Sequence, residues 1–159
     1  MKQTQIISIA NQKGGVGKTT TTVNLGTALT RQGKKVLLVD LDPQANLTMC
    51  MGIQKPDTLP ITITNIFAEL INKQQTLEPK DYMLTVEGCD IVPSSIPLAN
   101  IEPSIINATS RETLLRRFLK QFVGAYDYIL IDCMPFLGTL TINAFTASTS
   151  VLIPVQVEF

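Results

Sequence analysis

The sequence predicts an α/β protein built on a doubly wound, mostly parallel sheet. Short apolar runs that are typical of strands alternate with segments of helical periodicity, and this alternation indicates βαβ units. Two of the runs, residues 35–40 and 128–132, are almost continuously apolar, as expected of strands that are buried on both faces. A glycine-rich segment follows the apolar run at residues 5–10 and leads into a helix.

The expected elements alternate along the whole chain. Strands are predicted at residues 5–10, 35–40, 82–86, 90–92, 128–132 and 151–155. Helices are predicted at residues 18–32, 64–72, 114–122 and 140–147, and a loop-rich stretch at 41–62. Gly33 is expected just beyond the end of a helix, and Thr109 and Glu112 have the spacing of a capping box.

We expect a single domain over residues 1–159 that lacks its C-terminal part. A chain of 159 residues suits one domain. The sequence stops directly after the last predicted strand, whereas a doubly wound sheet needs helices over both faces. The sheet is therefore expected to be truncated at its C-terminal end.

Composition excludes several classes of protein. The chain is 45% hydrophobic and 16% charged, which argues against intrinsic disorder, and no apolar run reaches the length of a membrane span. It contains no histidine, so catalysis by histidine and histidine–metal sites are excluded. Cys50, Cys89 and Cys133 form no CxxC pair, so neither a disulfide framework nor a zinc site is expected. A reducing, cytoplasmic setting fits this cysteine usage.

A phosphate-binding loop is predicted between the first strand and the first helix, the setting that a P-loop requires. Its residues are Lys13, Gly14, Gly15, Val16, Gly17, Lys18, Thr19 and Thr20. The glycines let backbone N–H groups turn towards an anion, and the following helix directs its positive end to the same point. Lys18 can reach the β- and γ-phosphates of a nucleotide, and Thr19 can offer its hydroxyl to Mg²⁺. Gln12 stands where the strict pattern has glycine, and a glycine-rich turn that binds nothing is the alternative.

Residues 11–20 resemble the deviant Walker A loop of the ParA/Soj partition ATPases. Three further blocks are similar to that family in order and spacing. Residues 36–47 (VLLVDLDPQANL) resemble its second strand and switch I, and residues 126–135 (YDYILIDCMP) resemble its Walker B strand and switch II. Residues 139–158 resemble the stretch that leads to its PVQxE segment. The likeness spans nearly the whole chain and implies a P-loop NTPase-like, Rossmann-like fold and a Mg²⁺-dependent ATPase that dimerises around ATP.

The resemblance also implies roles for single residues. Lys13 matches the family's signature lysine, which reaches the partner's phosphates in the ATP-bound dimer, and Lys18 matches the P-loop lysine that acts within its own subunit. Asp42 matches the switch I aspartate that positions the attacking water. Asp132 would hold Mg²⁺ as the Walker B carboxylate, with Asp40 near the metal. The alternatives are a surface lysine at position 13 and carboxylates that only cap turns.

The sequence departs from the family pattern in switch II. The family usually reads D-x-P-P-S-L-G, whereas this chain has Met134 in place of the first proline and Phe136 in place of serine. Loss of a proline should loosen the loop, so we expect γ-phosphate sensing and dimer closure to be affected more than nucleotide binding. Cys133 beside this loop is either a redox-sensitive thiol or, as its apolar setting favours, a buried structural one.

The function expected from the resemblance is an ATPase switch in plasmid or chromosome partition. Its expected partners are a second copy of the chain, a ParB-type activator and nonspecific DNA bound through the absent C-terminal part, in a cytoplasmic, nucleoid-associated setting without a membrane. Two alternatives stay open: a piece that binds nucleotide without hydrolysing it, and a MinD-like positioning ATPase.

Three cations in the 114–122 helix, Arg116, Arg117 and Lys120, fall largely off its apolar stripe. A solvated helix face and a polyanion-binding surface are both consistent with this pattern.

Overall fold

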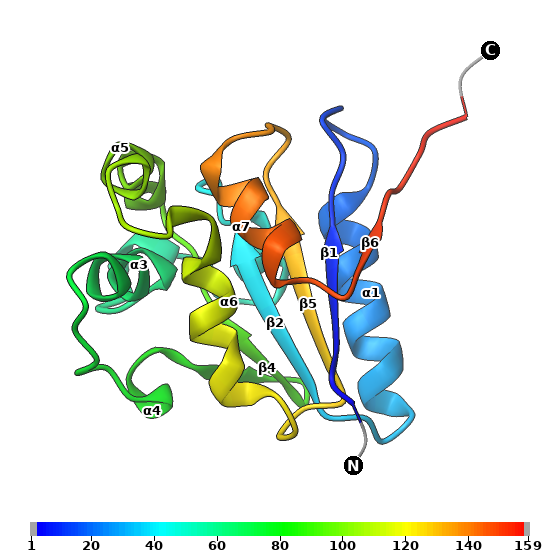
Figure 1. The fold of residues 1–159 in the computed structure, drawn as a ribbon. Coiled ribbons are helices and arrows are strands. Elements are labelled where there is room, and N and C mark those ends of the chain that lie inside the picture. Colours follow the sequence, from blue (N-terminus) through cyan, green and yellow to red (C-terminus); the bar gives the residue numbers. More distant parts are fainter. Residues whose placement is uncertain (1–2, 158–159) are drawn as a thin grey trace.

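The computed structural model describes residues 3–157 as a six-stranded sheet between two layers of helices (Figure 1). The strands are β1 (Gln5–Ile9), β2 (Val36–Leu41), β3 (Leu84–Val86), β4 (Cys89–Val92), β5 (Tyr128–Cys133) and β6 (Ser150–Leu152). They lie in the order β3-β4-β2-β5-β1-β6. Every neighbouring pair is parallel except the β3–β4 hairpin. The predicted α/β class with a mostly parallel sheet is confirmed.

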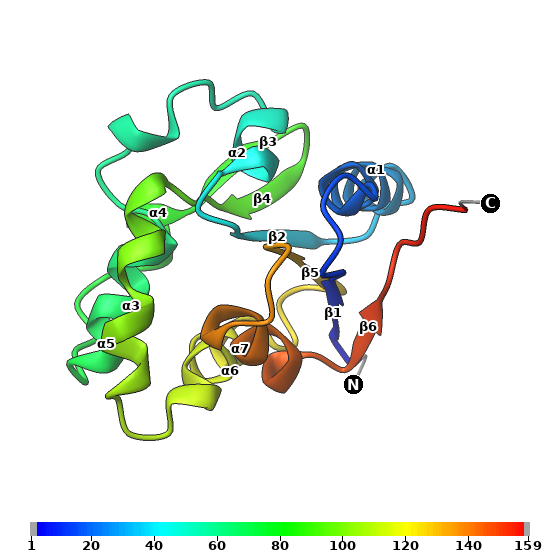
Figure 2. The same ribbon diagram turned by 90° about the horizontal axis from the view of Figure 1, so that it is seen from above.

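The helices are divided between the two faces of the sheet. They are α1 (Lys18–Arg31), α2 (Asn46–Cys50), α3 (Ile63–Ile71), α4 (Pro79–Tyr82), α5 (Glu102–Ile106), α6 (Leu114–Leu119) and α7 (Thr139–Ala147). Figure 2 shows α1 and α2 on one side of the sheet, and α3, α5, α6 and α7 on the other. This double covering is the arrangement that the continuous apolar strands require.

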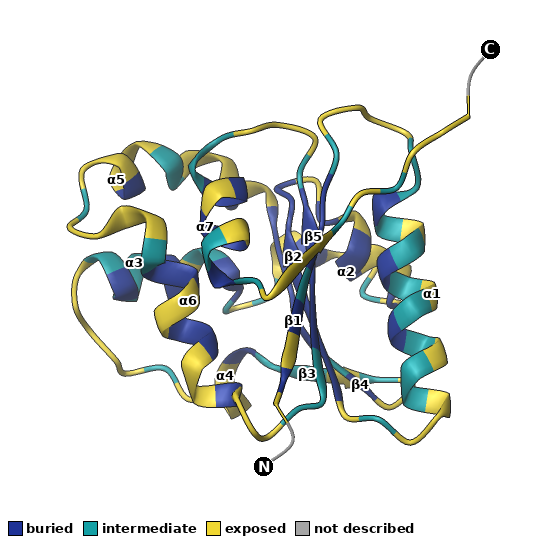
Figure 3. Cartoon of the chain, turned by 45° about the vertical axis from the view of Figure 1, so that its right-hand side comes forward, coloured by how far each residue is buried: buried dark blue, intermediate teal, exposed yellow. Residues whose placement is uncertain are grey.

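The central strands β2 and β5 are buried on both faces, as Figure 3 shows. Successive side chains of a strand point to opposite faces, so the strands feed two separate cores. Leu37 and Val39 belong to the core beneath α3, α6 and α7. Leu38 and Leu130 belong to the core beneath α1 and α2. The apolar runs that predicted these strands are therefore explained by burial on both sides.

Helix α1 ends as the sequence predicts. Gly33 has φ 76° and follows the last helical residues, and the backbone N–H of Lys34 donates to the carbonyl of Leu29 at 3.1 Å. A left-handed residue at this point favours glycine. Within the same helix, a Cβ at Gly26 would lie 2.8 Å from Leu38 Cδ2. Glycine at this position therefore lets α1 approach β2 closely.

Several predicted boundaries are wrong. The stretch 41–62 contains α2, and Tyr82 ends a helix rather than beginning a strand. Helix α5 lies where no element was predicted, and the last strand stops at Leu152 rather than continuing to residue 155. These elements have three to five residues, and at that length local periodicity is too short to distinguish a helix from a loop.

The predicted capping box before α6 is also wrong. Ser110 has φ 54°, a 3₁₀ turn spans Arg111–Thr113, and α6 begins without a side-chain cap from its own sequence. The cap comes instead from α7, where Asn143 Oδ1 accepts the Leu115 N–H at 3.1 Å. Asn143 is fully buried, and its Nδ2 donates to the Arg111 carbonyl at 2.8 Å. A tertiary contact thus replaces the local one.

Candidate functional site

The site residues meet where β1, β2 and β5 end. Asp132 of β5 is paired in register with Ile9 of β1 on one side and with Asp40 of β2 on the other. From β1 the chain crosses through α1 to β2, and from β5 it crosses through α7 to β6 on the other side of β1. In open α/β sheets, ligands bind at the carboxyl ends of strands where such crossings diverge.

The predicted phosphate loop joins β1 to α1 above this edge. Gly15 and Gly17 have φ 73° and 87°, a conformation that disfavours side chains. A Cβ built at Gly14, Gly15 or Gly17 meets nothing within 4 Å. These glycines are thus not needed for packing against neighbours. They leave the loop backbone open to an anion at the start of a helix of 14 residues.

Two side chains brace the loop. Lys18 is buried, and its Nζ donates to the Lys13 carbonyl at 3.1 Å across the loop. The Asn11 Oδ1 accepts the Lys13 N–H at 2.9 Å, and Asn11 Nδ2 donates to the Pro154 carbonyl at 2.8 Å. The Lys18 ammonium therefore lies within the loop, where it can neutralise a phosphate.

Thr19 and Asp132, the two residues predicted to bind Mg²⁺, lie in direct contact. The Thr19 hydroxyl donates to Asp132 Oδ2 at 2.7 Å. The Thr22 hydroxyl lies 3.0 Å from the Lys18 carbonyl and 3.4 Å from Asp132 Oδ1. Burial raises the pKa of Asp132 to about 6, an effect opposed by the Thr19 hydrogen bond and reinforced by the Asp42 charge. This carboxylate would gain from a neighbouring cation.

Asp40 is fully buried and already has three hydrogen-bond donors. Its Oδ2 accepts the Thr48 N–H at 2.8 Å and the Thr48 hydroxyl at 2.6 Å, and its Oδ1 accepts the Asp42 N–H at 3.2 Å. Burial raises its pKa to about 7, against the lowering effect of the Thr48 hydrogen bonds. These contacts hold the loop after β2 and the start of α2, so Asp40 positions that loop.

Asp42 follows β2 at the same edge and is buried. Its Oδ1 accepts the Gln44 N–H at 2.9 Å, which makes a side-chain turn. The next turn residue, Ala45, has φ 52°, a left-handed conformation that costs free energy for any residue with a Cβ. A loop held in an unfavourable conformation next to a phosphate loop is a feature of functional sites.

The segment after β5 is open to solvent. Phe136 and Leu137 are exposed by 58% and 51%, while Met134 packs partly against the core. The Thr141 hydroxyl donates to the Phe136 carbonyl at 2.6 Å. A Cβ at Gly138 would lie 2.6 Å from Glu102 Oε1 and 2.9 Å from the Phe136 ring, so a larger residue here would have to displace these two side chains.

Three contributors to the site were missed by sequence reasoning. Thr48 fixes Asp40, Thr22 lies beside Asp132, and Glu102 Oε1 accepts the Thr139 hydroxyl at 3.1 Å where α7 begins. Thr22 is four residues from Lys18 in the same helix, so helical spacing could have indicated it. No pattern in the sequence indicates Thr48 or Glu102, because their partners are in other elements.

The residues present fit a nucleoside triphosphate and Mg²⁺. Open backbone amides, a helix N-terminus and the Lys18 ammonium are donors for phosphate oxygens. The Thr19 hydroxyl and the Asp132 carboxylate are oxygen ligands of the kind that Mg²⁺ prefers.

The fold and this loop define a nucleotide-binding protein of the P-loop class. Residues 4–159 match the family described as an AAA domain. Over 155 residues the chain is 49% identical to the sporulation initiation inhibitor protein Soj of Bacillus subtilis, covering 98% of this chain and 59% of Soj. It is 43% identical over 158 residues to the chromosome partitioning protein ParA of Myxococcus xanthus, covering 98% and 53%. The chain therefore belongs to the AAA domain family and, within it, to the ParA/Soj-type partition ATPases.

A solved structure agrees with this assignment of fold. A cobyrinic acid a,c-diamide synthase from Mycobacterium smegmatis, with bound ATP analogue and magnesium, superposes with a TM-score of 0.90 at 41% identity. The match covers 98% of this chain and 62% of that one. The chain thus spans about half to three fifths of the length of these relatives. Within residues 3–157, no helix has the length and apolar character that crossing a membrane requires.

Proposed function

We propose that the chain binds Mg²⁺ and ATP in the loop Lys13–Thr20 and is the nucleotide-binding portion of a ParA-type ATPase that acts in plasmid or chromosome partition. The observation that carries the proposal is the 2.7 Å contact between Thr19 and Asp132 at the foot of an open phosphate loop. It places the two proposed metal ligands together beside the proposed phosphate site. The solved relative with a bound ATP analogue and magnesium supports the choice of ligand.

Each proposed binding residue has one task. The amides of residues 14–19 and the positive end of α1 hold phosphate oxygens, and Lys18 exchanges its bond to the Lys13 carbonyl for a bond to phosphate. Thr19 and Asp132 hold Mg²⁺, and the bound metal would neutralise charge that develops on the phosphates during transfer.

We further propose that hydrolysis depends on Asp42 and Lys13. Asp42 lies at the mouth of the site, on a loop that Asp40 and Thr48 hold in place, and we assign it the positioning of the attacking water. Lys13 is exposed on the loop surface, as a side chain that reaches a second copy must be. An added cation there would stabilise the transition state. Asp40 then acts near the metal through the Asp42 loop and not as a direct ligand.

The names of the relatives support the biological setting. Soj and ParA are both longer than this chain, so dimerisation around ATP, activation by a ParB-type protein and binding to nonspecific DNA are proposed for the whole protein. The proposed location is the cytoplasm, in association with the nucleoid.

The binding proposal is tested by titrating fluorescent ATP with and without Mg²⁺. Lys18→Ala should weaken binding roughly tenfold to a hundredfold in both conditions, because a charge-assisted hydrogen bond to phosphate is lost. Thr19→Ala should weaken it only when Mg²⁺ is present. Asn24→Ala on the exposed face of α1 is the matched control and should bind as the unmodified chain does. Equal affinity in all four proteins would refute the site.

Turnover separates Asp42 from the binding residues. In a longer protein that carries this region, Asp42→Ala should lower kcat with little change in KM, because a water-positioning group acts mainly in the transition state. Parallel loss of ATP binding would instead make Asp42 a structural residue.

A further inference from the structure

A second open site lies at the opposite end of β1 from the phosphate loop. It is a groove of about 680 Å³ between α6 and the segment that joins α7 to β6. Residues Gln3 and Thr4 line it just before β1 begins, whereas the phosphate loop follows the end of that strand. A ligand in this groove would therefore be remote from a nucleotide in the proposed ATP site.

One side of the groove is strongly cationic. Arg116, Arg117 and Lys120 line it and are exposed, and no acidic residue is among its lining. Arg116 and Lys120 are four residues apart, which is about 6 Å along a helix. Within residues 3–157 none of the three side chains makes a hydrogen bond or an ion pair. The three cations are free to bind an external anion.

The hydroxyl groups of the groove are not free to do so. Each of the lining hydroxyls donates to a backbone carbonyl of the chain itself, at distances from 2.7 to 2.9 Å; they belong to Thr4, Thr113, Thr146, Ser148 and Thr149. Each hydroxyl has a single proton to donate. Apart from the exposed Gln3 amide, the neutral side-chain donors that usually accompany cations in binding a phosphodiester backbone are therefore already used.

The rest of the groove is apolar. Ile6 and Ala147 are buried at its base, and Val123 beside the cations is 53% exposed. A nucleic-acid backbone is dominated by charged phosphates, and its sugar C–H groups cover such a side chain less completely than an aliphatic side chain does. A polypeptide with carboxylates along one side and aliphatic side chains along the other matches both parts of the groove.

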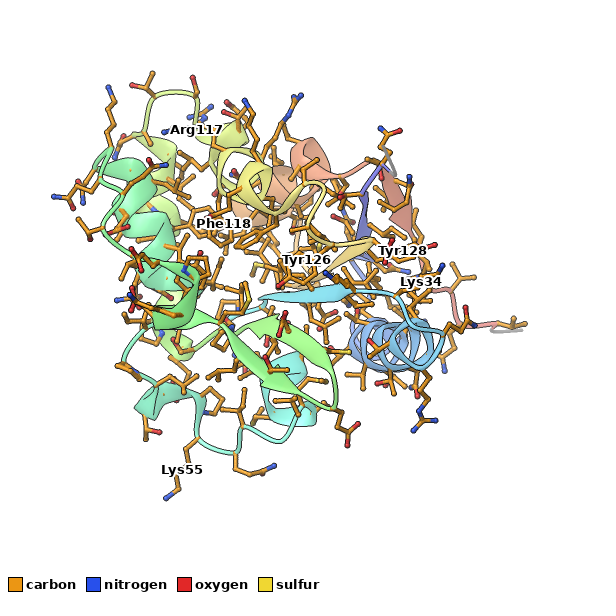
Figure 4. The ribbon with its side chains drawn as sticks, turned by 90° about the horizontal axis from the view of Figure 1, so that it is seen from below. Lys34, Lys55, Arg117, Phe118, Tyr126 and Tyr128 are labelled. Atoms are coloured by element: carbon orange, nitrogen blue, oxygen red, sulfur yellow. The ribbon has the colours of Figure 1, made fainter. Side chains whose placement is uncertain are left out.

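We propose that this groove binds an acidic, amphipathic polypeptide segment of a partner protein. The carboxylates of the segment pair with Arg116, Arg117 and Lys120, and its aliphatic side chains cover Val123. The contact is independent of the proposed ATPase function, because the groove shares no residue with the phosphate loop. Figure 4 shows Arg117 on α6, away from Lys34 and Lys55 on other parts of the surface.

The test measures binding of a short fluorescein-labelled peptide of glutamate and leucine, arranged as an amphipathic helix, by fluorescence anisotropy. The triple variant Arg116→Gln, Arg117→Gln, Lys120→Gln should weaken binding at least about tenfold, since each exposed ion pair contributes about twofold to fivefold. Raising the ionic strength to physiological values should weaken binding by the unmodified chain. The control variant Arg31→Gln, Lys34→Gln, Lys55→Gln removes the same charge elsewhere and should change affinity less than about twofold.

A charge-reversed variant with a charge-reversed peptide keeps the test decisive, because poor folding can cause a loss of binding but not a gain of binding to a new peptide. Arg116→Glu, Arg117→Glu, Lys120→Glu should bind the same peptide with lysine in place of glutamate, which the unmodified chain should not bind. Equal loss in the groove variant and the control variant would overturn the proposal, as would equal binding of a glutamine version of the peptide. Binding of a short DNA duplex through these three cations, without binding of the acidic peptide, would also overturn it and would assign the groove to nucleic acid.

Discussion

Replacing Asp132 by asparagine should stabilise the ligand-free protein at neutral pH while removing its ability to hold Mg²⁺. The carboxylate is 1% exposed, and burial raises its pKa from 3.8 to about 6. Asparagine can satisfy both neighbours. Its oxygen can accept the Thr19 hydroxyl, and its amide can donate to Thr22, whose own proton then goes entirely to the Lys18 carbonyl. The substitution therefore removes a buried charge without leaving an unpaired group.

The size of the effect follows from the pKa. A carboxyl whose pKa is raised by folding binds its proton more tightly in the folded chain. Its contribution to stability is fully present below pH 3.8 and is lost as the pH rises through about 6. The interval between these values corresponds to about 3 kcal/mol of free energy of unfolding. Because the unfolded carboxyl is already partly ionised at pH 4, the difference in stability between Asp132→Asn and the unmodified chain should grow by about 2.5 kcal/mol between about pH 4 and about pH 8.

The assay is urea unfolding at both pH values in buffer that contains a chelator. Glu87→Gln, at an exposed carboxylate in the β3–β4 turn, is the control and should show little change with pH. A stability difference for Asp132→Asn that is the same at both pH values would refute the electrostatic reasoning. A loss of stability that increases with pH would show that the charged form is the one that the fold stabilises.

Three further outcomes are expected. Lys18→Met should leave the free energy of unfolding in urea within about 1 kcal/mol of that of the unmodified chain, because the lost bond to the Lys13 carbonyl is one hydrogen bond, while ATP binding falls in a fluorescence titration. Gly26→Val should destabilise the chain by about 1–3 kcal/mol in urea, because a Cβ there lies 2.8 Å from Leu38 Cδ2 in a packed core; an unchanged midpoint would show that α1 can move away freely. A thiol reagent should label Cys50 alone in the folded chain, as counted by mass spectrometry, since Cys50 is exposed whereas burial raises the pKa of Cys133 to about 12; rapid labelling of Cys133 would support the redox alternative.

Strong local patterns predicted the framework of this protein. The two buried central strands, the first helix with its terminal glycine and the glycine-rich loop between β1 and α1 all appear where the sequence indicates. Each depends on short-range chemistry: apolar continuity for a strand covered on both sides, and glycine for a left-handed residue. The short helices α2, α4 and α5 did not have enough residues to show a period.

The sequence by itself determined which residue types could bind phosphate and metal, because Lys18, Thr19 and the glycines are contiguous and follow a strand. Only the tertiary structure decided their partners. The register of β5 between β1 and β2 brings Asp132 to Thr19 and sets Asp40 beside Asp132. Hydrogen bonds between distant elements gave Asp40 its place against Thr48 and replaced the expected local cap of α6 by Asn143. Such bonds form only after the sheet and its helices have packed, since backbone groups buried in that packing must find partners wherever the fold provides them.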